Sequence, residues 1–448
     1  MLKRLVRNSF QRLGLTVARG DLRAENARLF AELTEARGAL VSTGDQLEAT
    51  REEVGRLRAA RDHAASVLAE CARTDPPVRK RLKDAPEVLA AVRDFVGGAG
   101  LFEQVNAILT DPEFSLEDRQ RYMKLFHHVY PEYYDRTLAA VATIVNGQYI
   151  RWRPREADQA PARRAAEELR REGVVHLGTP FTAEQVRDIQ TFFRRRPIYN
   201  GHVPMSARHR AMRRYVNHTA EQYPIGCVSG QDNALAPHIL EFALSPRILD
   251  TAAAYFGCAP RLSWLQSWWN FAGPGDYPHR QNFFHRDTND FGMFWVYIYL
   301  TDVGPGNGPH RLIRKSGDFA VVRERFERAK ADPALAKHMD GVIYTDLSGT
   351  GHGLSDEVKE LVFDGLCESM HGPAGTTFIT RGVDLHKVVT PLVEKRQIFA
   401  ARFCANELPY LGHDRDGEPV PAEVVADRVG DDAQLRYVTE RCFDWSRA

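Results

Sequence analysis

Two side chains of the segment FFHRDTND are spaced for metal binding. His285 and Asp287 are two residues apart, and on a β-strand such side chains point to the same face. A third ligand can come from His386, which lies roughly a hundred residues further on, near the start of another predicted strand. Two histidines and one carboxylate on one face of an octahedral Fe(II) ion leave three positions open, two for a chelating 2-oxo acid and one for O₂. The spacing therefore predicts a non-haem iron centre.

Two arginines are candidates for binding the distal carboxylate of such a 2-oxo acid. Arg396 follows His386 by ten residues, on the strand after a proline-containing turn, and a guanidinium fork matches the geometry of a carboxylate. Arg402 is the alternative, at a longer spacing from His386. Because an isolated His-x-Asp is frequent by chance, the prediction depends on the whole ordered set within one β-rich segment.

The elements that would position these residues are strands joined by Gly- and Pro-rich turns. The composition and pattern typical of β-strands are found in RLSWLQSWWNF, FFHRD, FGMFWVYIYLTDV, RLIRKSG, TTFITR and QIFAARF. A helical insertion is predicted over about 318–339, and GPGNGP at 304–309 is predicted to be a hairpin turn. Upstream, VVHLG predicts a short strand and Thr182 the N-cap of a helix. Many strands of this kind indicate a barrel or sandwich.

The N-terminal part has a different pattern. Over residues 22–71 the seam positions recur in steps of four and three and are mostly apolar, a span of ~75 Å of helix at ~1.5 Å per residue. Polar residues at Thr43, Thr50 and Arg61 interrupt this seam. We expect a modest coiled coil that makes the protein a homo-oligomer; a lone helix, or one folded back on its own chain, is the alternative. The basic start of the chain is either a helical lead-in or an amphipathic helix on a membrane surface.

The chain is therefore predicted to have four parts. They are a basic segment with a coiled coil over 1–75, an all-helical region over 76–158, a β-rich domain over 159–410 and a tail over 411–448.

Charge and composition exclude several classes of protein. In 448 residues, 60 Lys and Arg balance 59 Asp and Glu, so nucleic acid is not expected as a partner. No stretch approaches the ~20 apolar residues of a membrane span, so no transmembrane segment is expected. The six cysteines are scattered and form no CxxC, which argues against a disulfide framework or a zinc cluster. These features predict a cytoplasmic globular protein.

Over about residues 160–410 the chain resembles the phytanoyl-CoA dioxygenase-like (PhyH) family of Fe(II)/2-oxoglutarate oxygenases. The segments that carry the resemblance are EGVVHLGTPFTAEQV, FFHRDTNDFGMFWVYIYLTDVGPGNGPH and GPAGTTFITRGVDLHKVVTPLVEKRQIFAARF. The resemblance implies an α+β protein whose core is a double-stranded β-helix, the jelly-roll or cupin-like fold.

The resemblance also assigns residues. Iron would be held by His285, Asp287 and His386, and 2-oxoglutarate by Arg396, with Thr288 and Gln266 as additional 2-oxoglutarate contacts. The family often has a Gly-Ser-His segment after its Asn-Gly-Pro, where this chain has Arg314-Lys315-Ser316-Gly317. This departure bears on substrate contacts and leaves the iron site intact.

The implied activity is that of a dioxygenase with Fe(II), 2-oxoglutarate and O₂. It would hydroxylate a small-molecule, lipid, glycan or natural-product substrate, free or carrier-linked, and release succinate and CO₂. Related halogenases replace the metal carboxylate with a small residue so that chloride can bind, and Asp287 occupies that position here. The alternative is a non-catalytic oligomeric binding or scaffold protein built on the same barrel and coiled coil.

Overall fold

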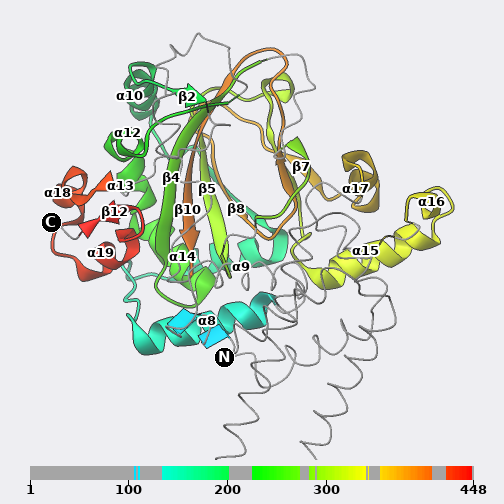
Figure 1. The fold of residues 1–448 in the computed structure, drawn as a ribbon, viewed down its shortest axis with the longest axis horizontal. Coiled ribbons are helices and arrows are strands. Elements are labelled where there is room, and N and C mark those ends of the chain that lie inside the picture. The colour runs from blue at the N-terminus through cyan, green and yellow to red at the C-terminus, as the bar shows by residue number, and fades with distance from the viewer. Residues whose placement is uncertain are drawn as a thin grey trace, which may run out of the picture. The chain divides into compact units, whose positions relative to one another are not determined.

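The computed structural model describes part of the chain, drawn as a ribbon in Figure 1. The described residues are 105–106, 109–110, 134–200, 225–272, 282–287, 290–339, 342, 354–405 and 420–445. The predicted coiled coil over 22–71, the basic start of the chain and Thr288 all lie outside these residues, as does most of the predicted helical region 76–158.

The described elements alternate between helices and strands. The α-helices are α8 (Tyr134–Gln148), α9 (Ala160–Glu172), α10 (Ala183–Arg194), α12 (Gly230–Leu235), α13 (Ile239–Ala243), α14 (Pro246–Phe256), α15 (Phe319–Ala331), α16 (Ala336–Met339), α17 (Asp356–Val362), α18 (Ala426–Val429) and α19 (Ala433–Thr439), and the 3₁₀ helices are η3 (Pro305–Asn307) and η5 (Ala422–Val424). The strands are β1 (Val174–Gly178), β2 (Tyr199–Asn200), β3 (Ile225–Cys227), β4 (Arg261–Asn270), β5 (Met293–Tyr299), β6 (His310–Ile313), β7 (Cys367–Ser369), β8 (Thr377–Arg381), β9 (His386–Val388), β10 (Arg396–Cys404), β11 (Val420–Pro421) and β12 (Phe443–Asp444).

Two antiparallel sheets form the core. The large sheet has the strand order β1-β8-β5-β10-β4-β3-β2, and the small sheet has the order β7-β6-β9. Every residue of the central strands β5 and β10 is buried, because helices cover one face of the large sheet and the small sheet faces the other (Figure 1). Tyr299 of β5 and Ile398 of β10 pack there with Leu312 of β6 in one apolar cluster. The α+β class is confirmed, and the iron-binding candidates lie at this junction of the sheets.

Two local predictions were wrong. FFHRD is not a regular strand, because among the described residues only His285 forms a bridge, with His386. GPGNGP is not a hairpin turn: it contains η3 and leads from β5 in the large sheet to β6 in the small one. The crossing is tight at Gly308, whose φ is +69°, and a Cβ there would collide with the carbonyl oxygen of Val389. Glycine meets both demands.

Elements on both sides of the predicted β-rich domain contact it. Helix α8 packs on α14, where the Tyr134 and Tyr255 hydroxyls lie 3.1 Å apart. Near the C-terminus, the Arg261 guanidinium of β4 donates to the Tyr437 carbonyl at 2.7 Å. The domain boundaries at 158/159 and 410/411 stay predictions. No helix within the described part of the chain is both long and apolar enough to span a membrane.

The carboxylate of Asp250 on α14 anchors the segment between α8 and α9. It is buried and accepts hydrogen bonds from the Trp152 indole at 2.9 Å, from the Arg155 amide at 3.0 Å and from the Glu156 amide at 2.9 Å. The Gln159 side chain adds a bond of 2.9 Å. One buried carboxylate thus satisfies four donors of this segment.

We expect Asp250→Ala to lower the free energy of unfolding by about 3 kcal/mol or more, because each donor left unsatisfied costs about 1–3 kcal/mol. Urea unfolding measures the change. Asp158→Ala is the matched control, since the Asp158 carboxylate accepts only from the exposed Ala160 amide among the described contacts. It is expected to cost about 1 kcal/mol or less. Equal losses for the two variants would refute the anchoring role of Asp250.

Candidate metal centre

The two histidine candidates lie directly opposite each other on neighbouring segments. The His285 amide donates to the His386 carbonyl at 3.0 Å, and the His386 amide donates to the His285 carbonyl at 2.9 Å. Residues paired in this way in an antiparallel ladder project to the same side. The imidazole centroids are accordingly 4.5 Å apart. The cross-strand bridge brings the rings together without a continuous strand through 285–287.

Asp287 completes the group. Its amide donates to the Gly382 carbonyl at 2.8 Å, which holds the carboxylate beside both rings. Asp287 Oδ1 lies 3.8 Å from His285 Nε2, and Oδ2 lies 3.4 Å from His386 Nε2. One ligand atom from each residue falls within 4.8 Å of the others. The structure therefore brings together the three residues that the sequence selected.

Hydrogen bonds to the other ring nitrogens orient both histidines. His285 Nδ1 lies 2.8 Å from the Phe283 carbonyl oxygen, and His386 Nδ1 lies 2.9 Å from the Asp384 carbonyl oxygen. A carbonyl oxygen only accepts, so each Nδ1 carries the proton and each Nε2 can present a lone pair. The Trp295 indole donates to Asp287 Oδ2 at 2.7 Å. This is the arrangement that metal ligands require.

The charges in the group also suit a cation. Burial, and then the neighbouring His386, lower the pKa of His285 to about 4. Burial opposes ionisation of Asp287, but the two imidazoles and the Trp295 indole hold its pKa well below its ordinary value. For His386, burial is outweighed by the Asp287 carboxylate, which raises the pKa. An anionic carboxylate and a neutral His285 are the forms that bind metal.

The segment that departs from the family pattern supports the strand of His386. Ser316 Oγ accepts from the Leu385 amide at 2.6 Å, and the Gly317 amide donates to the Asp384 carboxylate at 2.6 Å. Asp384 is fully buried and also pairs with Arg381 at 2.6 Å. In the described structure, these contacts fix the residues that precede His386.

Arg396 opens β10 on the face that points between the sheets. It is fully buried, its Nη2 donates to Asn270 Oδ1 at 2.6 Å and its Nη1 donates to the Gly308 carbonyl. Its Nε has no hydrogen-bond partner, and no carboxylate of the described residues forms an ion pair with it. Burial lowers its pKa. A buried cation without a counter-charge fits an anionic ligand.

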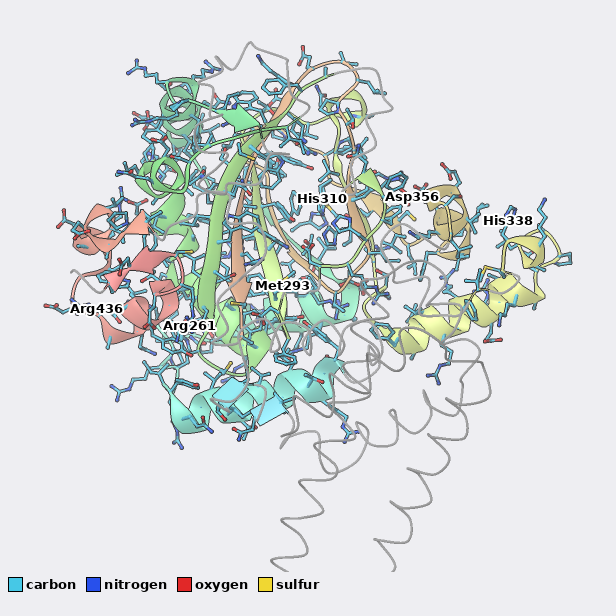
Figure 2. All side chains as sticks on the ribbon, viewed as in Figure 1. Arg261, Met293, His310, His338, Asp356 and Arg436 are labelled. Atoms are coloured by element: carbon cyan, nitrogen blue, oxygen red, sulfur yellow. The ribbon has the colours of Figure 1, made fainter. Side chains whose placement is uncertain are left out.

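His310 is a further candidate, which the sequence pattern does not single out. Figure 2 places it between the sheets, where its ring lies 4.8 Å from that of Tyr297 and 5.6 Å from that of His386. It is 2% exposed, and its Nε2 has no hydrogen-bond partner. Both this nitrogen and Arg396 Nε are thus buried without a hydrogen-bond partner. The only signal in the sequence is a polar residue at an inward position after Asn-Gly-Pro.

The other predicted cosubstrate residues have different surroundings. Gln266 of β4 is buried opposite Ala400 of β10 and shares the inward face. Arg402 lies on the same face of β10, where its Nε donates to Ser263 Oγ at 2.8 Å. Its guanidinium lies 5.3 and 5.4 Å from the rings of Trp264 and Trp295. Arg402 is thus engaged by aromatic rings, which favours Arg396 for the carboxylate.

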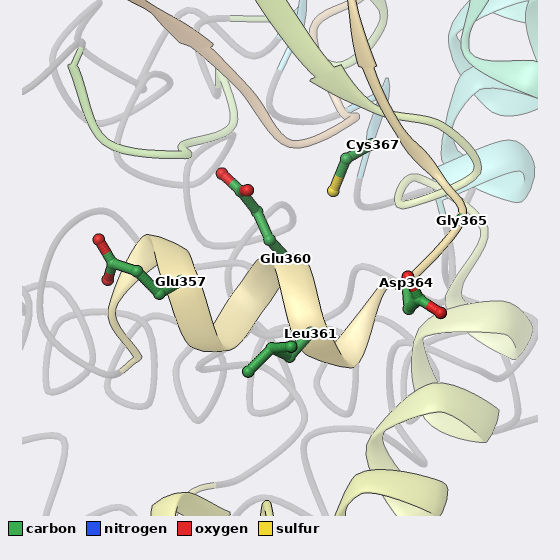
Figure 3. Close-up of a pocket in the computed structure, with 6 residues that line it drawn as sticks. All are labelled: Glu357, Glu360, Leu361, Asp364, Gly365 and Cys367. Carbon is green, nitrogen blue, oxygen red and sulfur yellow. The ribbon is translucent and has the colours of Figure 1, made fainter.

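A surface hollow beside α17 is separate from this group (Figure 3). It is lined by Glu357, Glu360, Leu361, Asp364, Gly365 and Cys367. None of these is a metal candidate of the triad, and Glu360 already pairs with Arg311 at 2.7 Å.

One protein family model matches the part of the chain that carries His285 and Asp287. Residues 169–339 match the family model described as Phytanoyl-CoA dioxygenase (PhyH). The expected resemblance is confirmed for that segment, which includes His285 and Asp287. The donor set of two histidines and one carboxylate fits the Fe(II) and 2-oxoglutarate that this family uses.

Comparisons with individual proteins are more distant. No curated protein matches. Among solved structures, the "non-heme alpha ketoglutarate dependent epimerase SnoN from nogalamycin biosynthesis" is 14% identical, with a TM-score of 0.33 over 55% of this chain and 84% of that one. EctD from S. alaskensis is 18% identical, with a TM-score of 0.36 over 57% and 81%. HygX from Streptomyces hygroscopicus, with nickel and 2-oxoglutarate bound, is 14% identical, with a TM-score of 0.34 over 56% and 96%. These likenesses are too distant to assign an activity.

Proposed function

We propose that the protein is an Fe(II)- and 2-oxoglutarate-dependent oxygenase that hydroxylates a small-molecule or carrier-linked substrate and releases succinate and CO₂. The observation that carries the proposal is the convergence of His285, Asp287 and His386, each oriented by a hydrogen bond to an atom outside the group. Together, Fe(II) and 2-oxoglutarate supply the activation of O₂ needed to oxidise an unreactive C–H bond.

Different residues of this chain bind the metal and the cosubstrate. His285, Asp287 and His386 hold the metal, and the Trp295 indole keeps Asp287 turned toward the rings. The guanidinium of Arg396 pairs with the distal carboxylate of 2-oxoglutarate. This pairing explains why so buried a cation is tolerated, because the ligand supplies the missing charge.

Three further residues are proposed to contact 2-oxoglutarate. His310 Nε2 gains the hydrogen-bond partner that it otherwise lacks. Gln266 contributes an amide from the same inward face, and Thr288 is retained from the family resemblance. Partly buried Trp264 and Trp268 pack against the apolar cluster between the sheets and form part of the wall that excludes water.

The finer points of architecture belong to the same proposal. We infer that the two sheets form a double-stranded β-helix, since antiparallel strands of the large and small sheets enclose one apolar cluster. The coiled coil over 22–71 and the homo-oligomer remain sequence predictions.

A cytoplasmic location is supported by the free thiols of Cys227, Cys258, Cys367, Cys404 and Cys442. The alternative of a non-catalytic scaffold is disfavoured, because a scaffold has no use for an intact triad.

Oxygen insertion, or another two-electron oxidation, is expected in place of halogenation. Asp287 occupies the carboxylate position, and its two oxygens face the two imidazoles, so chloride has no vacant ligand position there. The check is to incubate the protein with Fe(II), 2-oxoglutarate and a metabolite panel under ¹⁸O₂ in chloride buffer, and to analyse succinate and products by mass spectrometry. Succinate carrying ¹⁸O and an oxidised product are expected. A chlorinated product from the unmodified protein would contradict the assignment.

A further inference from the structure

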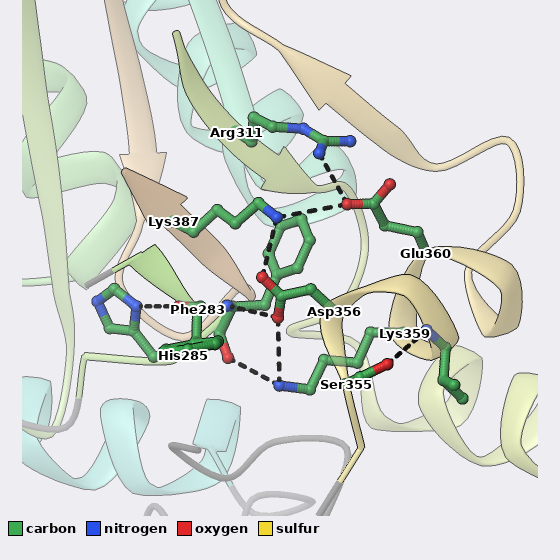
Figure 4. A network of polar contacts seen from close by, with 10 residues as sticks. Phe283, His285, Arg311, Ser355, Asp356, Lys359, Glu360 and Lys387 are labelled. Carbon is green, nitrogen blue, oxygen red and sulfur yellow. Dashed lines mark hydrogen bonds and ion pairs between the residues drawn. The ribbon is translucent and has the colours of Figure 1, made fainter. Parts of the chain in front are cut away.

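Helix α17 completes the open edge of the small sheet where His285 lies. In an antiparallel ladder, successive residues direct their backbone groups to opposite sides. Because His285 pairs with His386, the amide and carbonyl of Phe284 point away from β9. Both are satisfied by side chains of α17: Asp356 Oδ1 accepts from the Phe284 amide at 3.0 Å, and Lys359 Nζ donates to the Phe284 carbonyl at 3.0 Å (Figure 4). The helix replaces a neighbouring strand.

The second oxygen of Asp356 reaches the other histidine segment. Asp356 Oδ2 accepts from Lys387 Nζ at 2.9 Å, and Lys387 directly follows His386. Lys387 Nζ also lies 4.5 Å from the centre of the Phe284 ring. One carboxylate therefore joins the residue before one proposed ligand to the residue after the other (Figure 4).

Asp356 and Lys359 are both buried, so the loss of either charge would not be compensated by water. Lys359 is 1% exposed and Asp356 is 9% exposed, and Lys359 Nζ lies 3.8 Å from Asp356 Oδ1. Removing the carboxylate charge would leave the buried Lys359 without its ion-pair partner, and truncating the side chain would also leave the Phe284 amide without its acceptor. The segment that carries His285 would then lose the support that α17 adds to the His285–His386 bridge.

We propose that Asp356 is a positioning residue for the iron centre, which acts through Phe284 and Lys387 to set the spacing of His285 and His386. This inference rests on the proposed function and extends it to α17, which lies outside the segment matched to the family model. Lys359 acts together with Asp356, because its Nζ donates to the carbonyl of Phe284.

The test is the affinity for Fe(II) alone, measured anaerobically by titration against a chromophoric chelator, for Asp356→Asn, Asp356→Ala and Lys359→Met. Loss of a group that hydrogen-bonds a metal ligand directly costs about 10–100-fold in metal affinity. Asp356 contacts the neighbours of the ligands, so we expect a loss of about tenfold, the lower end of that range, for Asp356→Ala. Asp356→Asn retains an oxygen for the Phe284 amide and should lose less. Lys359→Met should weaken binding in the same direction.

Glu357→Gln is the matched control. Glu357 is an exposed carboxylate on the same helix, and among the described residues no hydrogen bond or ion pair joins it to Phe284 or Lys387. Its Fe(II) affinity should equal that of the unmodified protein. Circular dichroism and thermal unfolding establish that each variant is folded at the titration temperature; should Asp356→Ala not fold, the other two variants decide.

The outcomes separate this inference from the proposed function. If the unmodified protein binds Fe(II) and the folded Asp356 and Lys359 variants bind it equally well, α17 has only a structural role and the inference is wrong. If the variants lose stability without losing affinity, the same conclusion holds. If the unmodified protein binds no Fe(II), the proposed function fails as well.

Discussion

Replacement of His386 by alanine is expected to abolish both Fe(II) binding and turnover. His386 Nε2 faces Asp287, its Nδ1 is held by the Asp384 carbonyl, and its backbone pairs with His285. The substitution removes one of three proposed protein ligands, so affinity should fall by more than roughly a hundredfold, beyond the loss typical of an outer hydrogen-bond partner. Iron content after anaerobic loading and desalting measures this loss. His285→Ala and Asp287→Ala should behave in the same way.

His371→Ala is the control, because it removes a histidine that is not a proposed metal ligand. His371 is exposed and is not one of the grouped ligand residues. Its alanine variant should retain one Fe(II) per chain. Stoichiometric iron in His386→Ala would show that the metal assignment is wrong.

The second large effect is expected for Arg396→Ala, which should lower the affinity for 2-oxoglutarate without changing the affinity for Fe(II). A charge-assisted pair contributes ~1.5–3 kcal/mol, so Arg396→Ala should weaken 2-oxoglutarate binding by roughly ten- to a hundredfold. Fe(II) binding should be unaffected, because the Arg396 guanidinium contacts Asn270 and Gly308 and none of the proposed ligands. Isothermal titration of 2-oxoglutarate into the anaerobic Fe(II) protein gives the ratio. High cosubstrate concentration should restore part of the turnover.

Arg402 provides the comparison for this prediction. Arg402→Lys keeps a cation beside Trp264 and Trp295 and should bind 2-oxoglutarate as the unmodified protein does. If Arg396→Ala titrates normally and Arg402→Lys does not, the cosubstrate carboxylate is held by Arg402.

Much of the core was predictable because its signals are local. The apolar runs over 261–270, 293–299 and 396–404 are long enough to be recognised as buried strands, and the structure has β4, β5 and β10 there. The helical insertion predicted over 318–339 is present as α15 and α16. Strand periodicity and turn chemistry suffice for such elements.

The supporting contacts of the site could not be predicted, because they depend on pairing between distant segments. FFHRD has the composition of a strand, but its order comes from one bridge to His386 and from side chains of α17. Nothing in DEVKELV, a short amphipathic helix by its pattern, indicates that Asp356 would reach Phe284. His310 could not be selected from the sequence, because its position beside His386 and Tyr297 depends on the crossing at η3.

The most direct test of the central claim is an anaerobic titration of the metal-free protein with Fe(II) in the presence of 2-oxoglutarate, followed by visible absorption. If His285, Asp287 and His386 hold iron and leave positions for a chelating 2-oxo acid, a charge-transfer band should grow and saturate at one Fe(II) per chain. The band should be absent when either Fe(II) or 2-oxoglutarate is omitted. A protein that is folded and loaded under these conditions, yet develops no band, would contradict the assignment of the site and of the oxygenase function.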